Sequence, residues 1–343
     1  MGEPSGRGRG AVGSGHVLGV DSGGSGLRIA VAHAADDAAR PLAVRTSREP
    51  VRIGPAGIDA GHLLSQLLPA AEELQREVGA DGFTAVCVGA AGAATLGDEL
   101  RTRLPAALAT AFGARHCALA ADAVTAYAGA LGQRPGVVIA AGTGLIALGT
   151  DPTAAGGWRR ADGWGHLLGD CGGGAWIGRA GLEAALREYD GRPGGSAALL
   201  ARAEAVFGLA RALPGALYPR PDRPAVLASF APEVAGCATG GDTVALGILR
   251  AAAGHLADAA AAACPPAADS VVACTGGLFG LGEPLLAPLR EALAERLPRA
   301  RRTVAAGSPL DGALAIAAAL AGDRLTLPAD AELLQITRPA PGS

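Results

Sequence analysis

The sequence predicts an α/β fold, and two patterns support that prediction. Apolar strands alternate with helices whose apolar residues recur three and four positions apart, as in the expected helix over 57–78 and strand over 83–88. Two strand pairs, at 16–34 and 137–148, are each closed by a glycine-rich turn. This repetition is what a duplicated fold would show. Because any two apolar hairpins look alike, an unrelated pair of hairpins is the equal alternative.

The elements follow in order from the residue pattern. The first hairpin has strands over 17–21 and 27–32 around a turn at 22–26, where glycines allow positive φ and close backbone approach. A short strand near Leu42 leads to the helix over 57–78. After the strand over 83–88 we expect a helix over 96–112, a strand over 117–121, a helix over 123–131, the second hairpin, a mostly helical region to 263 with a loop at 219–224, a strand over 270–274, a helix over 310–321 and a polar tail.

Composition excludes several classes of protein. Of 343 residues, 50% are hydrophobic and 18% charged, which is ample for a packed core and argues against disorder. All 29 basic residues are arginine, which excludes sites that need an ε-amine: a P-loop, a protein-kinase lysine, a Schiff base or a pyridoxal anchor. The net charge is -3 and the arginines are scattered, so no nucleic-acid partner is expected.

The chain shows no targeting or metal-binding pattern. The longest apolar run, 137–150, is interrupted by glycines and is shorter than the roughly 20 residues of a membrane-spanning helix, so no membrane partner is expected. The first 15 residues lack an apolar signal-peptide core, which predicts a loose tail on a cytoplasmic protein. The six cysteines form no CxxC pair, so neither a zinc ribbon nor an iron–sulfur site is expected.

Three glycine turns that follow apolar strands are candidate phosphate sites. Asp21 ends the first strand before Ser22, Gly23, Gly24 and Ser25, a turn whose backbone amides can face an anion while the carboxylate holds hydrated Mg²⁺. The plain alternative is a hairpin with an Asp-led turn. The other two turns are Gly142-Thr143-Gly144 and Gly276-Gly277, of which the last could seat a nucleotide.

Asp122 stands where a strand gives way to a helix, which is where open α/β sheets gather ligands. A carboxylate there can accept the proton of a hydroxyl that attacks a phosphoryl group. The ordinary alternative is a helix N-cap, which is compatible with that role.

The stretch 163–178 is the most specific in the chain, because it is rich in glycine, contains Trp164 and Trp176 and leads into a helix. Such a segment suits a binding loop better than a core. Asp170 could accept sugar hydroxyls and Trp164 could pack on a ring face, whereas His166 is better explained as a structural histidine.

Together these motifs resemble a known family. The chain is similar to the N-acetylglucosamine kinase branch of the BadF/BadG/BcrA/BcrD ATPase family, within the actin, hexokinase and Hsp70 superfamily. Order and spacing match from about residue 16 to 321. The matching segments are 21–25, 122–123, 142–144, 163–166, 168–170, 276–277 and 311–313.

The resemblance implies a two-lobed actin-like (ribonuclease H-like) fold with ATP and sugar in a central cleft. We expect a flexible tail over 1–15, an N-terminal lobe over 16–121 with helix 310–321 as a candidate addition, a C-terminal lobe over 122–309 and a tail over 323–343. By this resemblance Asp122 is the general base and Asp21 the metal ligand. ATP would contact Asp21, Ser22, Gly23, Gly24, Ser25, Gly142, Thr143, Gly144, Gly276 and Gly277, and the sugar would contact Glu49, Asp122, Gly163, Trp164, Asp170 and Gly174.

The chain also departs from the family pattern. Ser25-Gly26 stands where the family often has Thr-Lys, Cys171 stands where it commonly has Glu, and its sugar-binding Asn has no clear match in 48–54. If Glu49 faces the C2 substituent of the sugar, a free ammonium is favoured over an acetamide. The related ROK kinases carry a zinc cluster, and the dehydratase activators carry cysteines for an iron–sulfur cluster; this chain has neither motif.

These inferences predict an ATP-dependent hexosamine kinase that uses Mg²⁺ and phosphorylates the 6-hydroxyl of N-acetylglucosamine or glucosamine. Its expected partners are ATP, an amino sugar and a second copy in a homodimer. Two alternatives stay open: a non-catalytic sugar sensor with the same fold, and an ATPase coupled to a partner protein.

Overall fold

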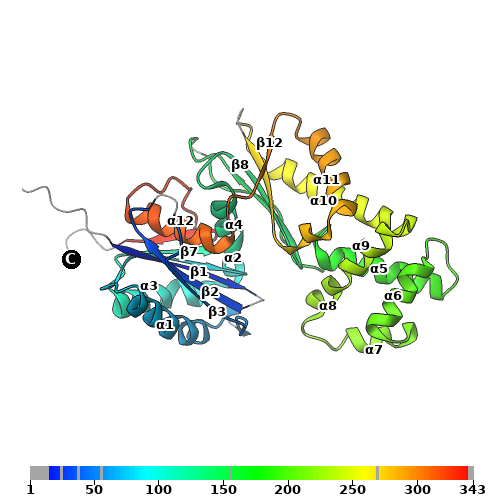
Figure 1. Ribbon diagram of the computed structural model, residues 1–343, viewed down its shortest axis with the longest axis horizontal. Coiled ribbons are helices and arrows are strands. Elements are labelled where there is room, and N and C mark those ends of the chain that lie inside the picture. Colours follow the sequence, from blue (N-terminus) through cyan, green and yellow to red (C-terminus); the bar gives the residue numbers. More distant parts are fainter. Residues whose placement is uncertain are drawn as a thin grey trace, which may run out of the picture. The chain divides into compact units, whose positions relative to one another are not determined.

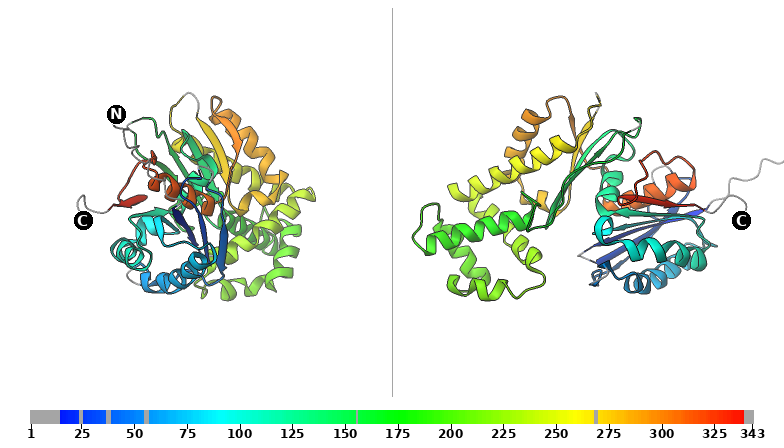
Figure 2. Two further views of the ribbon diagram at one scale, coloured as in Figure 1. Left: turned by 60° about the vertical axis from the view of Figure 1, so that its left-hand side comes forward. Right: turned by 180° about the vertical axis from the view of Figure 1, so that it is seen from behind.

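The computed structural model describes residues 15–23, 26–36, 39–54, 57–154, 156–267 and 270–338. The chain divides into two compact units (Figures 1 and 2). The first comprises residues 1–119, 313–325 and 335–343, and the second comprises 120–312 and 326–334. Each unit is built on its own sheet and has its own apolar core.

The sheet of the first unit has the strand order β13-β7-β6-β1-β2-β3. Strands β1 and β2 form the expected antiparallel hairpin, with His16 opposite His33 and Gly23 opposite Gly26, and β1 runs parallel to β6 on its other side. The strands are β1 (His16–Gly23), β2 (Gly26–His33), β3 (Ala43–Ser47), β6 (Phe83–Ala90), β7 (His116–Ala121) and β13 (Leu334–Thr337); β4 (Ile53–Gly54) and β5 (Gly57–Ile58) form a separate small ribbon.

Helices α1 (Ala60–Glu77) and α3 (Asp98–Phe112) cover one face of this sheet, and α12 (Pro309–Ala321) covers the other (Figure 1). Asp59 caps α1 by accepting a hydrogen bond from the amide of His62, 2.9 Å away. The inward leucines of α1 and α3, including Leu67 and Leu104, are fully buried in the core of this unit.

The second unit repeats the same strand plan, with the order β10-β9-β8-β11-β12. The hairpin β8–β9 corresponds to β1–β2, and β11 runs parallel to β8 as β6 does to β1. This shared topology supports the duplicated fold over an unrelated pair of hairpins. The strands are β8 (Gly136–Ala141), β9 (Leu145–Thr150), β10 (Arg159–Asp162), β11 (Val271–Thr275) and β12 (Arg301–Val304).

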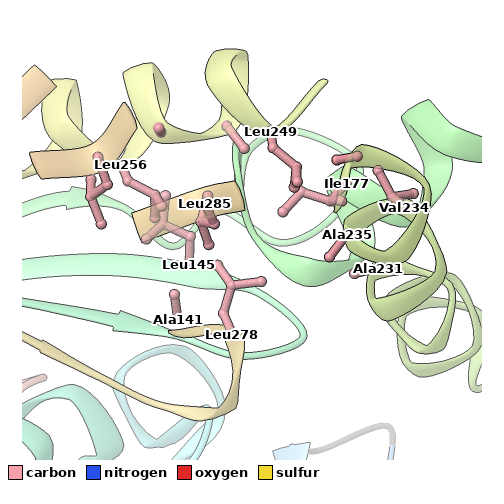
Figure 3. Packing of buried hydrophobic residues seen from close by; sticks show 14 of the residues in the cluster. Ala141, Leu145, Ile177, Ala231, Val234, Ala235, Leu249, Leu256, Leu278 and Leu285 are labelled. Carbon is pink, nitrogen blue, oxygen red and sulfur yellow. The ribbon is translucent and has the colours of Figure 1, made fainter. Parts of the chain in front are cut away.

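Helices fill the rest of the second unit, some packed against its sheet and the others packed against one another. Figure 3 shows part of this core, where Leu249 and Leu256 of helix α10 (Thr243–Ala263) contact apolar side chains from the strands and from neighbouring helices. The helices are α4 (Asp122–Leu131), α5 (Gly174–Tyr189), α6 (Ala197–Phe207), α7 (Leu213–Leu217), α8 (Arg223–Ser229), α9 (Ala231–Thr239), α10 (Thr243–Ala263) and α11 (Glu283–Arg296), with single 3₁₀ turns at Ala210–Ala212 and Gly277–Leu281.

The structure corrects three expectations. The expected tail over 323–343 contains strand β13, which joins the sheet of the first unit, and strands β10 and β12 were not predicted. The helix expected over 96–112 is α3, which begins at Asp98, and a short helix that was not expected, α2 (Ala93–Leu96), precedes it and ends at Gly97. A Cβ at Gly97 would lie 2.3 Å from the carbonyl oxygen of Ala93, so the backbone turns too tightly there for another residue.

By length and composition alone, one helix among the described residues, α10, could cross a membrane, although 137–150 was expected to be the longest apolar run. Its alanines and leucines lie in the apolar core of the second unit. Length and apolar composition do not distinguish a membrane-spanning helix from a buried core helix such as this one.

Glycine substitutions in two helices of this unit are expected to change stability in opposite directions. A Cβ at Gly178 of α5 would lie 1.7 Å from the carbonyl oxygen of Leu227 in α8, whereas a Cβ at Gly247 on the exposed face of α10 would meet nothing within 4 Å. Gly178→Ala should lower the free energy of unfolding by about 3 kcal/mol because the helices must separate. Gly247→Ala should raise it by about 0.5–1 kcal/mol through helix propensity. Urea denaturation measures both, and equal effects would contradict this account of the α5–α8 contact.

Candidate functional site

The turn Gly142–Gly144 at the end of β8 is fixed against the N-terminus of α5. The amide of Gly174 donates to the carbonyl of Gly142 (2.9 Å), and the amide of Ala175 donates to the carbonyl of Thr143 (2.8 Å). No side chain caps this helix, so the carbonyls of the turn satisfy its first amides. Within the described ranges, the amides of Thr143 and Gly144 donate to no protein acceptor. They are therefore available for an anion.

Glycine is required where three segments meet around this turn. A Cβ at Gly144 would lie 2.3 Å from Oδ2 of Asp170, and a Cβ at Gly173 would lie 2.7 Å from the carbonyl carbon of Gly144. Gly276 follows β11 with φ of 107°, and a Cβ there would lie 2.2 Å from the carbonyl oxygen of Ala141. The fold thus brings the predicted phosphate turn, the end of the predicted sugar loop and the predicted adenosine turn into backbone contact within the second unit.

Asp170 presents a carboxylate beside this turn. Its backbone has φ of 55°, and its Oδ1 accepts a hydrogen bond from the amide of Gly165 at 3.0 Å. Burial raises the pKa of the Asp170 carboxyl above its usual value, and the charge of Asp162 adds to this, while hydrogen bonds from the amides of Gly165 and Leu145 oppose it. A partly buried carboxylate held in this way is a strong acceptor for ligand hydroxyls.

Asp162 holds the base of the same loop through hydrogen bonds, a role that was not predicted from the sequence. Its two carboxylate oxygens accept hydrogen bonds from the amides of Asp170 (2.6 Å) and Cys171 (3.0 Å). Burial, followed by the charge of Asp162, raises the pKa of the Cys171 thiol, so Cys171 stays protonated and is not an activated nucleophile. The only hint in the sequence is an Asp directly before Gly163, which is a common turn pattern.

Trp164 is held at the surface of the loop. Its side chain is 65% exposed, and the guanidinium carbon of Arg160 lies 4.6 Å from the centre of its ring. Arg160 also donates to the carbonyls of Asp162 and Gly163, which fixes it beneath the indole. The loop thus offers an exposed aromatic surface whose position is set by a cation–π contact, as the proposed sugar contact requires.

Asp122 is the first residue of α4, directly after β7, and its side chain is exposed. Its Oδ1 accepts a hydrogen bond from the amide of Ala123 at 2.9 Å. The N-cap position belongs to Ala121, so the expectation of an Asp N-cap is wrong by one residue. In the first turn of a helix, the dipole favours the charged carboxylate that a general base needs.

In the first unit, the strand expected to end at Asp21 runs on to Gly23, so Asp21 lies within β1, in an ion pair with Arg28 on β2. The hydroxyl of Ser22 is fully buried and has no hydrogen-bond partner among the described residues. Gly24 and Ser25 lie outside the described residues. No group of three or more His, Cys, Asp or Glu side chains in the described ranges could hold a metal. A single carboxylate fits Mg²⁺, which is usually bound by one or two carboxylates with phosphates and water.

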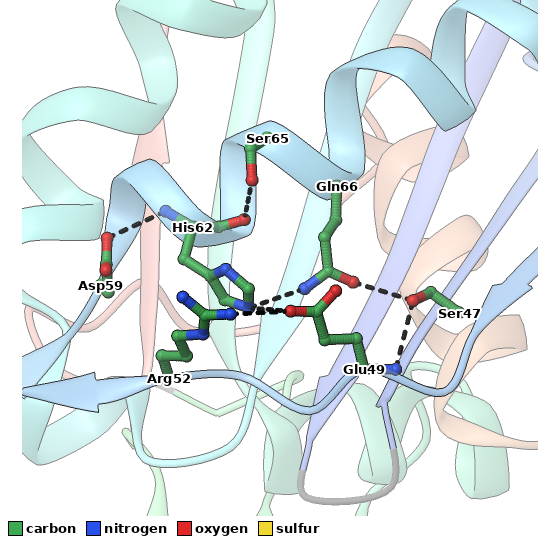
Figure 4. Close-up of polar contacts among 7 residues, drawn as sticks. All are labelled: Ser47, Glu49, Arg52, Asp59, His62, Ser65 and Gln66. Atoms are coloured by element: carbon green, nitrogen blue, oxygen red, sulfur yellow. Dashed lines mark hydrogen bonds and ion pairs between the residues drawn. The ribbon is translucent and has the colours of Figure 1, made fainter.

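Glu49 belongs to a closed polar network in the first unit (Figure 4). Its carboxylate pairs with Arg52 at 3.1 Å and lies 3.5 Å from Nε2 of His62, which in turn contacts Nε2 of Gln66 at 2.9 Å. The hydroxyl of Ser47 closes the network by donating to Oε1 of Gln66 and accepting from the amide of Glu49. The charge of Glu49 is therefore already compensated by Arg52, although half of the side chain is exposed.

The sequence of the chain matches the model of a known family. The model for the BadF/BadG/BcrA/BcrD ATPase family matches residues 18–321. This chain belongs to that family. The expected resemblance and the expected actin-like α/β fold are both confirmed.

The fold of this BadF-family chain is similar to the folds of solved proteins that are described as sugar kinases. It is similar to a Chromobacterium violaceum protein described as a candidate N-acetylglucosamine kinase, with 28% identity over 87% of this chain and 97% of that one and a TM-score of 0.64. A Streptomyces griseus ROK glucokinase, solved with glucose and AMPPNP, is 22% identical over 88% and 98% of the two chains, with a TM-score of 0.54.

A curated N-acetylmuramic acid/N-acetylglucosamine kinase from Clostridium acetobutylicum is 41% identical over 71 residues. These residues are 21% of this chain and 22% of the relative, so the similarity spans about a fifth of that protein's length.

The structure therefore brings together, within one unit, the predicted residues Gly142, Thr143, Gly144, Asp170, Gly174 and Gly276. Gly277 begins the 3₁₀ turn directly after Gly276, and Gly163 and Trp164 lie in the loop that Asp162 and Asp170 hold. Asp21, Ser22, Gly23 and Glu49 belong to the first unit. The roles of all these residues stay predictions.

Alanine substitutions at Gly142 and Gly144, two positions apart in the same turn, should separate the effect of the close approach from the effect of replacing a glycine. Gly144→Ala forces the new Cβ against the carboxylate of Asp170, which two backbone amides hold, and should cost about 1–3 kcal/mol of stability. Gly142→Ala is the matched control, because a Cβ there would meet nothing within 4 Å. Thermal unfolding should show a lower Tm for Gly144→Ala alone, and equal Tm values would contradict the close approach.

Proposed function

We propose that this chain is an ATP-dependent hexosamine kinase that phosphorylates the 6-hydroxyl of N-acetylglucosamine or glucosamine. The observation that supports this most is the meeting of an anion-binding turn, a hydroxyl-accepting carboxylate and a third glycine turn at one place in the second unit. Family membership and the 28% identity to the Chromobacterium violaceum protein support the same reaction class.

The reaction needs a base, an anion site and a hydroxyl acceptor, and this chain offers a candidate for each. Asp122 would accept the proton of the 6-hydroxyl as its oxygen attacks the terminal phosphorus of ATP. The free amides of Thr143 and Gly144 would bind phosphate oxygens, and Asp170 would accept a sugar hydroxyl. Positioning and charge stabilisation by these groups account for most of the catalysis expected for phosphoryl transfer.

Asp21 would hold Mg²⁺ through its carboxylate. When bound, the ion would supply positive charge that offsets the phosphate oxygens. Arg28, opposite Asp21 on the neighbouring strand β2, pairs with that carboxylate.

The direct test is ADP release from Mg·ATP with glucosamine, N-acetylglucosamine, N-acetylmannosamine, glucose or no sugar. Release that depends on one amino sugar supports the kinase and names its substrate. Equal release in every well would overturn the kinase in favour of an ATPase coupled to a partner. Silence throughout, with sugar binding intact by calorimetry, would overturn it in favour of a sensor.

Replacing Asp122, the proposed base, should lower kcat strongly while leaving the binding of the sugar intact. Asp122→Asn keeps the size of the side chain but cannot accept the proton, so kcat should fall by roughly 10²- to 10⁴-fold. Asp98→Asn is a matched control, since Asp98 is likewise the first residue of a helix and is almost fully exposed. Near-normal turnover of Asp122→Asn would refute the assignment of the base.

Glu49→Gln tests the choice between glucosamine and N-acetylglucosamine. If the carboxylate contacts the C2 substituent, the variant should shift the ratio of kcat/KM values toward the acetamide by roughly threefold to tenfold, a modest change because Arg52 already compensates the charge. Glu73→Gln, at an exposed carboxylate paired with Arg45, is the control. An unchanged preference in Glu49→Gln would remove Glu49 from the sugar site.

A further inference from the structure

A cavity in the second unit lies beside the loop that carries Trp164 and Asp170. Its volume is about 280 Å³, just below the range of roughly 300–1,000 Å³ that is usual for drug-sized ligands. Four leucines form much of its lining: Leu182 and Leu186 from α5, Leu217 from α7 and Leu227 from α8. Leu182 is buried, and the other three are partly buried on the core of the unit. The cavity therefore has an apolar lining that is anchored to a rigid core.

The loop supplies the remaining wall of the cavity. His166 and Leu167 line it, and Leu167 is 78% exposed despite its apolar side chain. The backbone closes on itself behind these two residues, since the amide of Gly169 donates to the carbonyl of Gly165 at 2.8 Å and Gly165 donates to Asp170. Leu167 is thus held outward, and its exposure is a consequence of the fold of the loop.

The charged residues around the cavity are mainly cationic. Two arginines, Arg179 and Arg223, and one carboxylate, that of Glu183, line it. The Glu183 carboxylate lies 3.6 Å from Nε of Arg179. Arg223 uses its Nε to donate to the carbonyl of Arg220. Within the part of the chain that the structure describes, its two terminal NH₂ groups have no hydrogen-bond or ion-pair partner. A planar pair of donors in this state matches a carboxylate.

We propose that this cavity is a binding site for a small amphipathic anion, a carboxylate attached to a short apolar chain or ring. The apolar part would cover the leucines and Leu167, and the carboxylate would pair with Arg223, with Arg179 close by. A free sugar is a poor occupant, because its many hydroxyls would lose water against an apolar lining that offers few partners. The site is separate from the proposed phosphate turn and needs no nucleotide.

Calorimetric titration of the full chain with sodium octanoate tests the proposal, with octylammonium and 1-octanol as ligands of the same length and different charge. Octanoate should bind one site per chain, 1-octanol should bind several-fold more weakly, and octylammonium should show no saturable binding. No binding of octanoate at millimolar concentrations, or equal binding of octanoate and octylammonium, would overturn the proposal.

Variants locate the site. Arg223→Gln should weaken octanoate roughly threefold to tenfold, the modest loss expected for a solvent-exposed charge pair. Arg211→Gln, at an exposed arginine outside the cavity lining, is the matched control and should change nothing. Leu217→Ser should weaken the binding of octanoate and of 1-octanol alike. Circular dichroism would check that this variant is folded. Octanoate binding that is the same in all three variants would place the ligand elsewhere and overturn the site. The titrations contain neither sugar nor ATP, so their failure would leave the proposed kinase activity untouched.

Discussion

The second unit depends on the bonds between the turn Gly142–Gly144 and the first amides of α5. A helix N-terminus carries unsatisfied amides and a partial positive charge, and here two carbonyls of the turn satisfy them. The carbonyls of Gly142 and Thr143 accept from the helix, and the amides of Thr143 and Gly144 have no protein acceptor among the described residues, so they can bind an anion. One set of contacts therefore fixes the end of β8, the start of α5 and the orientation of the proposed phosphate site.

The loop before α5 is held by carboxylates rather than by apolar packing. Asp162 binds the amides of Asp170 and Cys171, and Asp170 binds the amide of Gly165. Both residues adopt positive φ, an uncommon conformation for Asp that these bonds stabilise. A loop organised in this way keeps Trp164 and Leu167 at the surface, where each can contact a different ligand.

Arginine side chains hold three of the candidate site residues in place. Arg28 pairs with Asp21, Arg52 pairs with Glu49, and Arg160 supports Trp164. Arg28 and Arg52 each hold a carboxylate through one terminal nitrogen, and the planar guanidinium of Arg160 lies against the ring of Trp164. Asp21 and Glu49 are therefore already paired with a cation, and a bound cation would share or replace that partner.

The sequence by itself determined the α/β class, both hairpins, the three glycine turns and the position of Asp122 at the start of a helix, because these depend on local periodicity and on turn chemistry. It did not determine strands β10, β12 and β13, which are short and are strands only because a neighbouring strand pairs with them. Nor did it single out Asp162, whose role exists only once the loop brings the amides of residues 170 and 171 to its side chain. The tertiary structure alone decided which glycines meet, because backbone contact between residues 142–144, 173 and 276 is a matter of distance in space that no local pattern records.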